Sequence, residues 1–209
     1  MTRGMKVDGH KNLSQVFDIL DDLNDKSHCV KFYEEPEHAR MVEYHFIQTG
    51  LQKGEYCIYT THEDDISIIE SGMADFGIDV EGYKKIKMLH IYRIAEPQAG
   101  PQYLLQEIER LRKYIMADSK PSVRLVSRWM KNVEGEEEDQ LANLVVEQTV
   151  HSIFEKNQGL AMCPYPVKDI KAGMKGAWMQ NHLKNSHAVI FILKDGEGLA
   201  FKLNAQFSL

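Results

Sequence analysis

Residues 28–62 decide the fold: HCVKFYEEPEHARMVEYHFIQTGLQKGEYCIYTTH. The stretch begins and ends with short apolar runs, 28–33 and 55–61, which are rich in aromatic and β-branched residues and predict two strands. Pro36 suits the first turn of a helix between them, because the N–H that proline lacks has no partner at that position. The apolar face of this helix is formed by Ala39, Val42, Phe46 and Thr49.

Two glycines follow the helical pattern. We expect Gly50 to stop the helix and Gly54 to form the turn into the second strand. Two strands joined by a helix of this length form a βαβ unit, with parallel strands and a right-handed crossover. The stretch therefore predicts an α/β fold with a mostly parallel central sheet and helices on both faces.

The turn after the first strand, Tyr33-Glu34-Glu35-Pro36, lies at the carboxyl edge, where such sheets bind ligands. A nucleotide-binding loop here would read GxxxxGK[ST], so that backbone N–H groups and a lysine could hold phosphates. Two glutamates would repel a triphosphate instead. The fourth strand ends in Ser127-Arg128-Trp129, without the acidic residue that phosphate chemistry with magnesium needs. We do not expect ATP hydrolysis.

The remaining sequence continues the alternation. Further strands are predicted at 88–94, 123–129, 160–163, 187–193 and 199–207, and helices at 12–23, 62–76, 101–116 and 177–184. The acidic run 134–139 is expected to be a solvated loop leading into another helix, which runs to about residue 156. Pro164 and Pro166 are expected to stop the fifth strand, and the turn at 195–198 to make the last two strands an antiparallel hairpin at one edge. We predict a single domain over 1–209, with residues 1–11 as a flexible lead.

Composition excludes several classes of protein. A formal net charge of −6 is atypical of a general nucleic-acid binder. No apolar run reaches the roughly 18 residues that a membrane span needs, and the N-terminal residues lack the apolar segment of a secretion signal. We therefore expect a cytoplasmic protein that binds neither nucleic acid nor membrane directly.

Cysteines and histidines allow two interpretations. The three cysteines all lie in predicted strands: Cys29, Cys57 and Cys163. Their odd number favours reduced, buried thiols. The alternative is a metal or redox site with His28 or His62, but no CxxC spacing supports it, so we expect no metal and no cofactor. We interpret His28 and His187, both at strand starts, as structural histidines bonded to the backbone.

Parallel strands would bring a set of polar and aromatic residues to the carboxyl edge: Tyr33, Glu34, His62, Arg93, Arg128, Trp129 and Tyr165. Aromatic walls with a few fixed polar groups are typical of a small-molecule pocket. In such a pocket Glu34 could pair with Arg93 or Arg128, or meet the polar end of a ligand. The alternative is that the aromatic residues belong to the core and that the arginines make surface ion pairs.

Several short motifs together carry a resemblance to a known family. They are His28 with Phe32-Tyr33-Glu34, Gly50-Leu51 with Lys53-Gly54-Glu55 and Cys57, Arg124-Leu125 with Trp129, Glu147, and Cys163-Pro164-Tyr165 followed by His187. Over residues 25–195 the chain resembles the MEDS family, the sensory domain of methanogen and methylotroph regulators. The resemblance implies a fold like that of RecA and KaiC without the phosphate-binding loop. It also implies sensing of small organic molecules, such as hydrocarbon derivatives, next to histidine kinase or DNA-binding modules. The chain shows no kinase or helix-turn-helix motif, so such a partner would act in trans.

Three functional hypotheses follow. The leading one is a non-enzymatic sensor that binds a small organic ligand at the carboxyl edge and signals to a histidine kinase or transcription regulator. The second is a scaffold that binds only protein, including a second copy of itself, with its pocket filled by side chains. The third is an enzyme that uses Glu34 and His62 as an acid–base pair.

Overall fold

The computed structural model describes residues 13–94, 122–128, 137–156, 158–167 and 175–203, together with residues 106, 109, 110 and 113. Its strands are β1 (Ser27–Tyr33), β2 (Tyr56–Thr61), β3 (Leu89–Arg93), β4 (Val123–Val126), β5 (Gly159–Pro166), β6 (Ala188–Ile192) and β7 (Gly198–Lys202). They form a seven-stranded sheet in the order β3-β2-β4-β5-β1-β6-β7. All neighbouring pairs are parallel except β6 and β7, which form the expected antiparallel hairpin at the edge.

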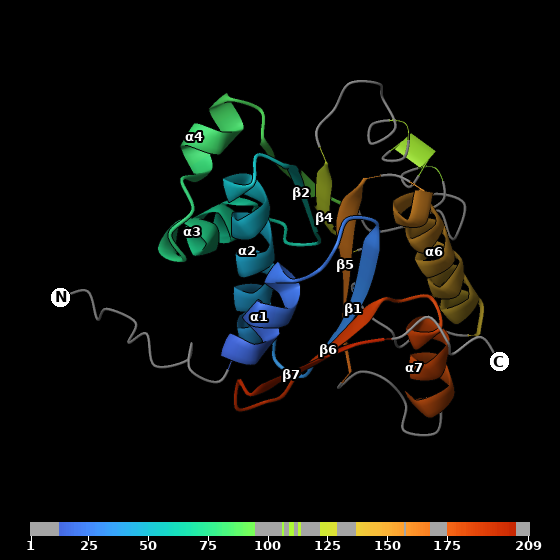
Figure 1. Cartoon of the computed structure of the whole chain (residues 1–209). Coiled ribbons are helices and arrows are strands. Elements are labelled where there is room, and N and C mark those ends of the chain that lie inside the picture. Colours follow the sequence, from blue (N-terminus) through green and yellow to red (C-terminus); the bar gives the residue numbers. More distant parts are fainter. Residues whose placement is uncertain are drawn as a thin grey trace.

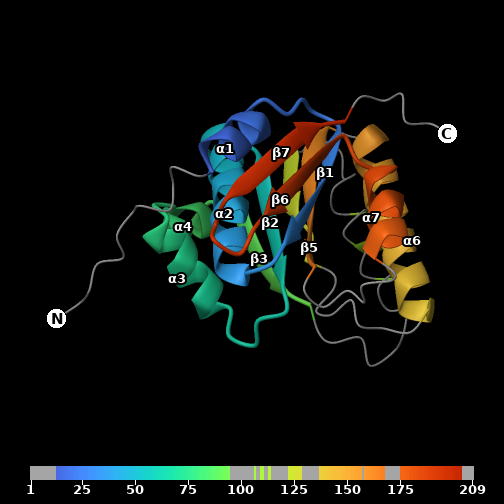
Figure 2. The ribbon, with the colours of Figure 1, turned by 90° about the horizontal axis from the view of Figure 1, so that it is seen from below.

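Helices cover both faces of the sheet, as Figures 1 and 2 show. One face carries α1 (Ser14–Asp21), α2 (Pro36–Gln52), α3 (Ser67–Asp75) and α4 (Val80–Lys85), and the other carries α6 (Glu137–Lys156) and α7 (Lys175–Leu183). The buried apolar side chains accordingly fall into two clusters, one on each side of the sheet. The α/β fold class predicted from the sequence is confirmed. None of the helices in the described part of the chain combines the length and apolarity needed to cross a membrane.

β1 lies at the centre of this arrangement, and all seven of its residues are buried. A parallel strand covered on both faces reads as a continuous apolar run, because each face packs against helices. Cys29 and Tyr33 face α2, while Val30 and Phe32 face α6. The strand nevertheless contains His28 and Lys31, both with no exposed surface. Polar groups in such places need partners, so these two residues mark where to look for function.

α2 begins at Pro36, as the sequence predicts, but it does not stop at Gly50. The helix continues to Gln52, and Gly54, with a φ of 76°, forms the turn. Gly50 has a packing role instead: a Cβ atom there would lie 2.6 Å from Cδ of Arg124 and 2.8 Å from Sγ of Cys57. The helix therefore approaches the sheet closely at this position because the residue has no side chain.

β5 continues through Pro164 and Pro166, so the prediction that these prolines end the strand is wrong. The reason lies in the neighbouring strand. β4 pairs with β5 only as far as Met162, whose carbonyl accepts the Ser127 N–H at 2.8 Å. Backbone groups alternate between the two sides of a strand, so both prolines face the side on which β4 has already ended. Their missing N–H groups cost no bond to β4.

Other differences concern the bounds of elements. The structure contains α4, a short helix that the sequence analysis missed, in which the Asp79 side chain accepts the Gly82 N–H at 3.0 Å. The predicted helix at 62–76 begins only at Ser67, and β4 ends at Val126 rather than at residue 129. Most of the helix predicted at 101–116 lies outside the described residues, as do residues 1–12 and 204–209.

Candidate functional site

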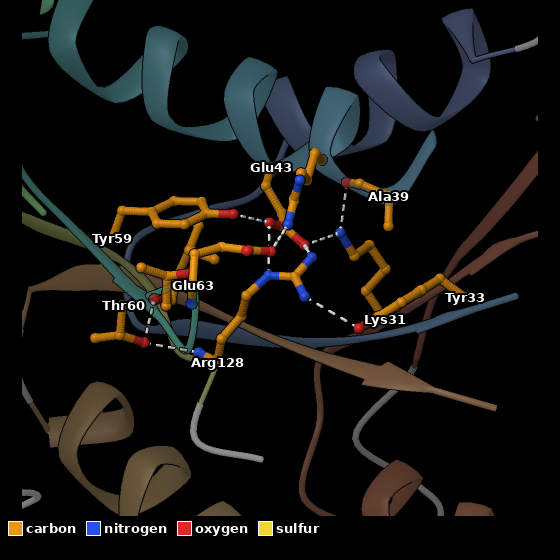
Figure 3. Close-up of polar contacts among 11 residues, drawn as sticks. Lys31, Tyr33, Ala39, Glu43, Tyr59, Thr60, Glu63 and Arg128 are labelled. Atoms are coloured by element: carbon orange, nitrogen blue, oxygen red, sulfur yellow. Dashed lines mark hydrogen bonds and ion pairs between the residues drawn. The ribbon is translucent and has the colours of Figure 1, made fainter. Parts of the chain in front are cut away.

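The parallel sheet brings Tyr33 and Arg128 together at its carboxyl edge, as the sequence analysis expected. Arg128 Nη1 donates a hydrogen bond to the Tyr33 hydroxyl at 3.0 Å, and the guanidinium carbon lies 5.2 Å from the centre of the Tyr33 ring (Figure 3). If β1 and β4 ended at opposite edges of the sheet, these two side chains would lie far apart. Their contact places the ends of β1 and β4 at one site.

Arg128 is held by its backbone as well as by its side chain. Its N–H donates to Oγ1 of Thr60 at 2.7 Å, and the Thr60 hydroxyl donates to the Val126 carbonyl at 3.1 Å (Figure 3). These bonds fasten the chain after β4 to the end of β2. The side chain is then directed to the face of the sheet that α2 covers.

A buried carboxylate from α2, Glu43, forms ion pairs with two cations, Lys31 and Arg128. Its Oε1 atom accepts from Lys31 Nζ at 2.5 Å and from Arg128 Nη2 at 2.6 Å. Its Oε2 atom accepts from Arg128 Nε at 3.0 Å and from the Tyr59 hydroxyl. We call Lys31, Tyr33, Glu43, Tyr59 and Arg128 the Glu43 cluster (Figure 3).

The Glu43 cluster is almost fully withdrawn from water. The side chains of Lys31 and Glu43 are 0% exposed and that of Arg128 is 13% exposed. Lys31 Nζ makes a further bond to the Ala39 carbonyl at 2.6 Å. Arg128 is therefore the cation of the cluster through which a molecule outside the core could make contact.

Charge pairing decides the ionisation of these groups. Burial disfavours the charged form of Glu43, but Arg128 and Lys31 outweigh it and lower its pKa to about 2. Burial lowers the pKa of Lys31 to about 8, although Glu43 acts in the opposite direction. Near neutral pH the cluster thus holds two cations and one carboxylate. The adjacent ion pair of Arg40 with Glu63 adds no net charge, so one positive charge is in excess.

Two of the predicted site residues have other partners than the sequence analysis suggested. Glu34 does not pair with an arginine: its side chain accepts the Lys194 N–H at 2.8 Å, beside the hairpin of β6 and β7. Arg93 pairs with Asp64 at 2.5 Å on the half-exposed surface beyond β3. Glu34 therefore lies on the β6 side of β1, whereas Arg128 approaches from the β4 side.

Tyr165 reaches the same edge but the opposite face. In the register of β1 and β5, Tyr165 lies beside Phe32, and Tyr33 lies beside Pro166. A shift of one residue exchanges the two faces of a strand. The Tyr165 hydroxyl donates to Oε1 of Glu147 on α6, away from the Glu43 cluster. His62 follows β2 at the carboxyl edge and is partly buried, while Trp129 lies outside the described residues.

Sequence reasoning missed Lys31, Glu43 and Tyr59. The signals were present in the pattern: Lys31 interrupts an apolar central strand, and Glu43 is four residues after Ala39 and three before Phe46, within the buried helical stripe. A charged residue at such a position is either paired or functional. Its helix neighbours gave no indication of the partner, because Lys31 and Arg128 come from other elements.

The three thiols are buried and form no disulfide, and the two histidines bond to the backbone as the sequence analysis expects. Cys29, Cys57 and Cys163 are free and buried. His28 Nδ1 lies 2.8 Å from the Asn185 carbonyl, and the His28 N–H donates to Nδ1 of His187 at 3.1 Å. Both histidines therefore bond to the backbone. The second ring nitrogen of His28, Nε2, faces Cys163 and Glu147.

Comparison with known proteins agrees with this architecture. The family model described as MEDS, the methanogen/methylotroph, DcmR sensory domain, matches residues 27–183. A solved structure, a KaiC-like protein from the hyperthermophilic archaeon Pyrococcus horikoshii, is similar with a TM-score of 0.56 and 20% sequence identity, over 86% of this chain and 80% of that chain. At this identity the similarity shows the fold alone. The comparison with curated proteins gives no match.

Proposed function

The chain belongs to the MEDS family of sensory domains, and we propose on this basis that it binds a small organic ligand at the carboxyl edge of its sheet. The binding site would centre on Arg128 and Tyr33. The bound domain would then signal to a partner protein, a histidine kinase or transcription regulator in trans, and it would not be an enzyme.

The observation that carries the proposal is the state of the Arg128 guanidinium. Three of its five N–H groups bond to Glu43 and Tyr33, so two are left over within the described part of the chain. The Tyr33 hydroxyl accepts from Arg128 and so keeps its own hydrogen for another acceptor. Together with the excess positive charge, these groups favour a ligand with an anionic or strongly polar oxygen at one end. Its remaining part would be apolar, as in an oxidised hydrocarbon derivative.

The same geometry argues against a nucleotide as the ligand. Only Glu34 and Glu35 separate β1 from α2, and the lysine of β1, Lys31, is directed to Glu43 and the Ala39 carbonyl. A triphosphate would meet carboxylates at the turn and would find this lysine already neutralised. Binding of MgATP is therefore unfavourable.

A ligand oxygen on the two remaining N–H groups of Arg128 would compete with Glu43 for the charge of the guanidinium, although not for its bonded hydrogens. Because Glu43 belongs to α2 and Arg128 follows β4, the competition would change how this helix is held against the sheet. The size of the shift is limited by the difference in ligand affinity between the two arrangements. We propose that this movement of α2 is what a partner protein detects.

One observation favours a second candidate function, a scaffold that binds only protein. Lys31 and Glu43 are completely buried, so side chains already occupy the part of the crevice beneath Arg128. In that case the surface around the edge would bind a partner or a second copy of the chain. The two functions differ in whether any small molecule stabilises the protein.

A thermal-shift screen of short carboxylates, alcohols and aldehydes, followed by calorimetric titration of the hits, separates the two functions. Tyr33→Phe tests the site, since it removes one hydroxyl and keeps the ring. Loss of one hydrogen bond to a charged group costs about 1.5–3 kcal/mol, so the affinity should fall about 10- to 100-fold. Tyr83→Phe on α4 is the matched control and should bind normally. If no compound stabilises the wild-type chain, the sensor proposal fails and the scaffold is favoured. If Tyr33→Phe and the wild type bind the ligand with equal affinity, the proposed binding site at Tyr33 is wrong.

A further inference from the structure

A second group of buried polar side chains lies on the opposite face of the sheet, under α6. It consists of His28 from β1, Glu147 from α6 and Cys163 from β5, whose exposed fractions are 0%, 0% and 1%. One ligand atom from each residue, the His28 ring nitrogen, a Glu147 oxygen and the Cys163 sulfur, lies within 4.8 Å of the other two. Figure 1 shows α6 beside β5 and β1, the two strands that supply the other residues. This group is separate from the Glu43 cluster, which the sheet divides from it.

The hydrogen bond of His28 to the backbone fixes where its lone pair points. The Asn185 carbonyl, 2.8 Å from Nδ1, can only accept a hydrogen bond, so Nδ1 carries the proton. Nε2 is then unprotonated, and it lies 3.2 Å from Cys163 Sγ and 3.3 Å from Glu147 Oε2. The imidazole thus presents a lone pair to a thiol and a carboxylate.

Without a cation, the three groups satisfy one another only through the thiol proton and a proton on the Glu147 carboxyl, whose pKa burial raises to about 7. The Tyr165 hydroxyl bonds to Oε1 of Glu147, while Oε2 accepts no hydrogen bond from the described residues. When Glu147 is ionised, His28 Nε2 and Glu147 Oε2 offer each other only lone pairs, and the Cys163 thiol is a weak donor beside them. A buried arrangement of converging lone pairs is stabilised by a cation at its centre.

The distances from His28 Nε2 to the other two ligand atoms resemble those between the ligands of one metal ion. A tetrahedral zinc ion with bonds of about 2.0–2.3 Å holds its ligand atoms roughly 3.3–3.6 Å apart. The distances from His28 Nε2 to the sulfur and to the carboxylate oxygen, 3.2 and 3.3 Å, are close to that range. A thiolate with an imidazole selects a transition metal over magnesium or calcium, which prefer oxygen ligands.

We propose that His28, Glu147 and Cys163 bind one thiophilic divalent transition-metal ion of the zinc class. The partners around the site are those that metal ligands require: the Asn185 carbonyl orients the imidazole and the Tyr165 hydroxyl orients the carboxylate. The ion would join α6 to β1 and β5. Three protein ligands leave a fourth coordination position for water or for an electron-rich group. No spacing motif in the sequence predicts this site, because each ligand comes from a different element.

The test measures Co²⁺ and Zn²⁺ binding to the full-length chain after removal of metal with a chelator under reducing conditions. The wild type should bind Co²⁺ with a thiolate-to-cobalt charge-transfer band in its absorption spectrum, and equimolar Zn²⁺ should abolish that band. Cys163→Ser should lose the band. Tyr165→Phe should keep it with about 10- to 100-fold weaker binding, the usual effect of removing a partner of a metal ligand.

Cys29→Ser is the matched control, because Cys29 is equally buried in the adjacent strand β1 but faces α2. It should bind like the wild type. The proposal is overturned if the wild-type cobalt spectrum lacks the thiolate band, or if Cys163→Ser retains it. It is equally overturned if Cys29→Ser, rather than Cys163→Ser, loses the band. Where Cys163→Ser does not fold, the wild-type spectrum and the Tyr165→Phe affinity decide.

Discussion

Replacing Glu43 by glutamine should lower the free energy of unfolding far more than the small change in size of the side chain suggests. The substitution keeps the shape of the side chain but leaves Lys31 and Arg128 as buried cations without a counter-charge. The fall in the Glu43 pKa from 4.5 to about 2 corresponds to about 3 kcal/mol, at about 1.4 kcal/mol for each pH unit. Breaking a buried ion pair by removing one partner costs about 3–5 kcal/mol, which agrees. We expect Glu43→Gln to lose about 3 kcal/mol at pH 7.

The pH dependence makes this prediction specific. A carboxylate whose pKa is lower in the folded than in the unfolded protein stabilises the fold above the unfolded pKa, here about 4.5, and this stabilisation is lost as the pH falls towards 2. The difference between wild type and Glu43→Gln should therefore be full at pH 7 and shrink between pH 4.5 and 2. Urea denaturation at several pH values measures it, and Glu37→Gln, on the exposed side of α2, is the control, with an expected change below about 0.5 kcal/mol. A variant within 1 kcal/mol of wild type at pH 7, or a difference independent of pH, would refute the reasoning.

Three further outcomes follow from the structure. Gly50→Ala should lower the free energy of unfolding by about 1–3 kcal/mol in urea titrations, because its Cβ would lie 2.6 Å from Arg124 Cδ, whereas Gly176→Ala on open helix surface should leave it unchanged. Tyr59→Phe should cost about 1.5–3 kcal/mol in the same assay, since it removes a donor to a buried carboxylate, and Tyr83→Phe should cost less than about 0.5 kcal/mol. Millimolar MgATP should not raise the melting temperature, and tight uptake of MgATP in a calorimetric titration would contradict the account of the β1–α2 turn.

Much of the fold was predictable because it depends on local pattern. The run 28–62 carries the alternation of strand, helix and strand, and parallel pairing then fixes that Tyr33 and Arg128 share an edge. The strand bounds were less predictable where a neighbour decides them. Pro164 predicts a stop because a proline removes a ladder bond, yet β4 ends before that bond is needed.

The candidate site was harder to predict for two physical reasons. Glu43 is buried because cations from β1 and from the chain after β4 meet it, and no short-range pattern contains that information. The sequence pattern predicts Tyr165 and Tyr33 in one pocket, because both lie near the ends of strands at the same edge. Their separation depends on the register of β5 against β1, which a single residue reverses and which tertiary packing alone determines.

The prolines at the end of β5 also restrict how a partner can dock. Many proteins recognise extended peptides by adding them to a sheet as an extra strand, which requires backbone donors as well as acceptors along the strand they join. On the side that faces β4, the last residues of β5 offer carbonyl oxygens but no N–H groups at Pro164 and Pro166. An incoming peptide would find half of its hydrogen bonds missing there. Strand addition to these residues of β5 would therefore be weak, and recognition there would depend on side chains.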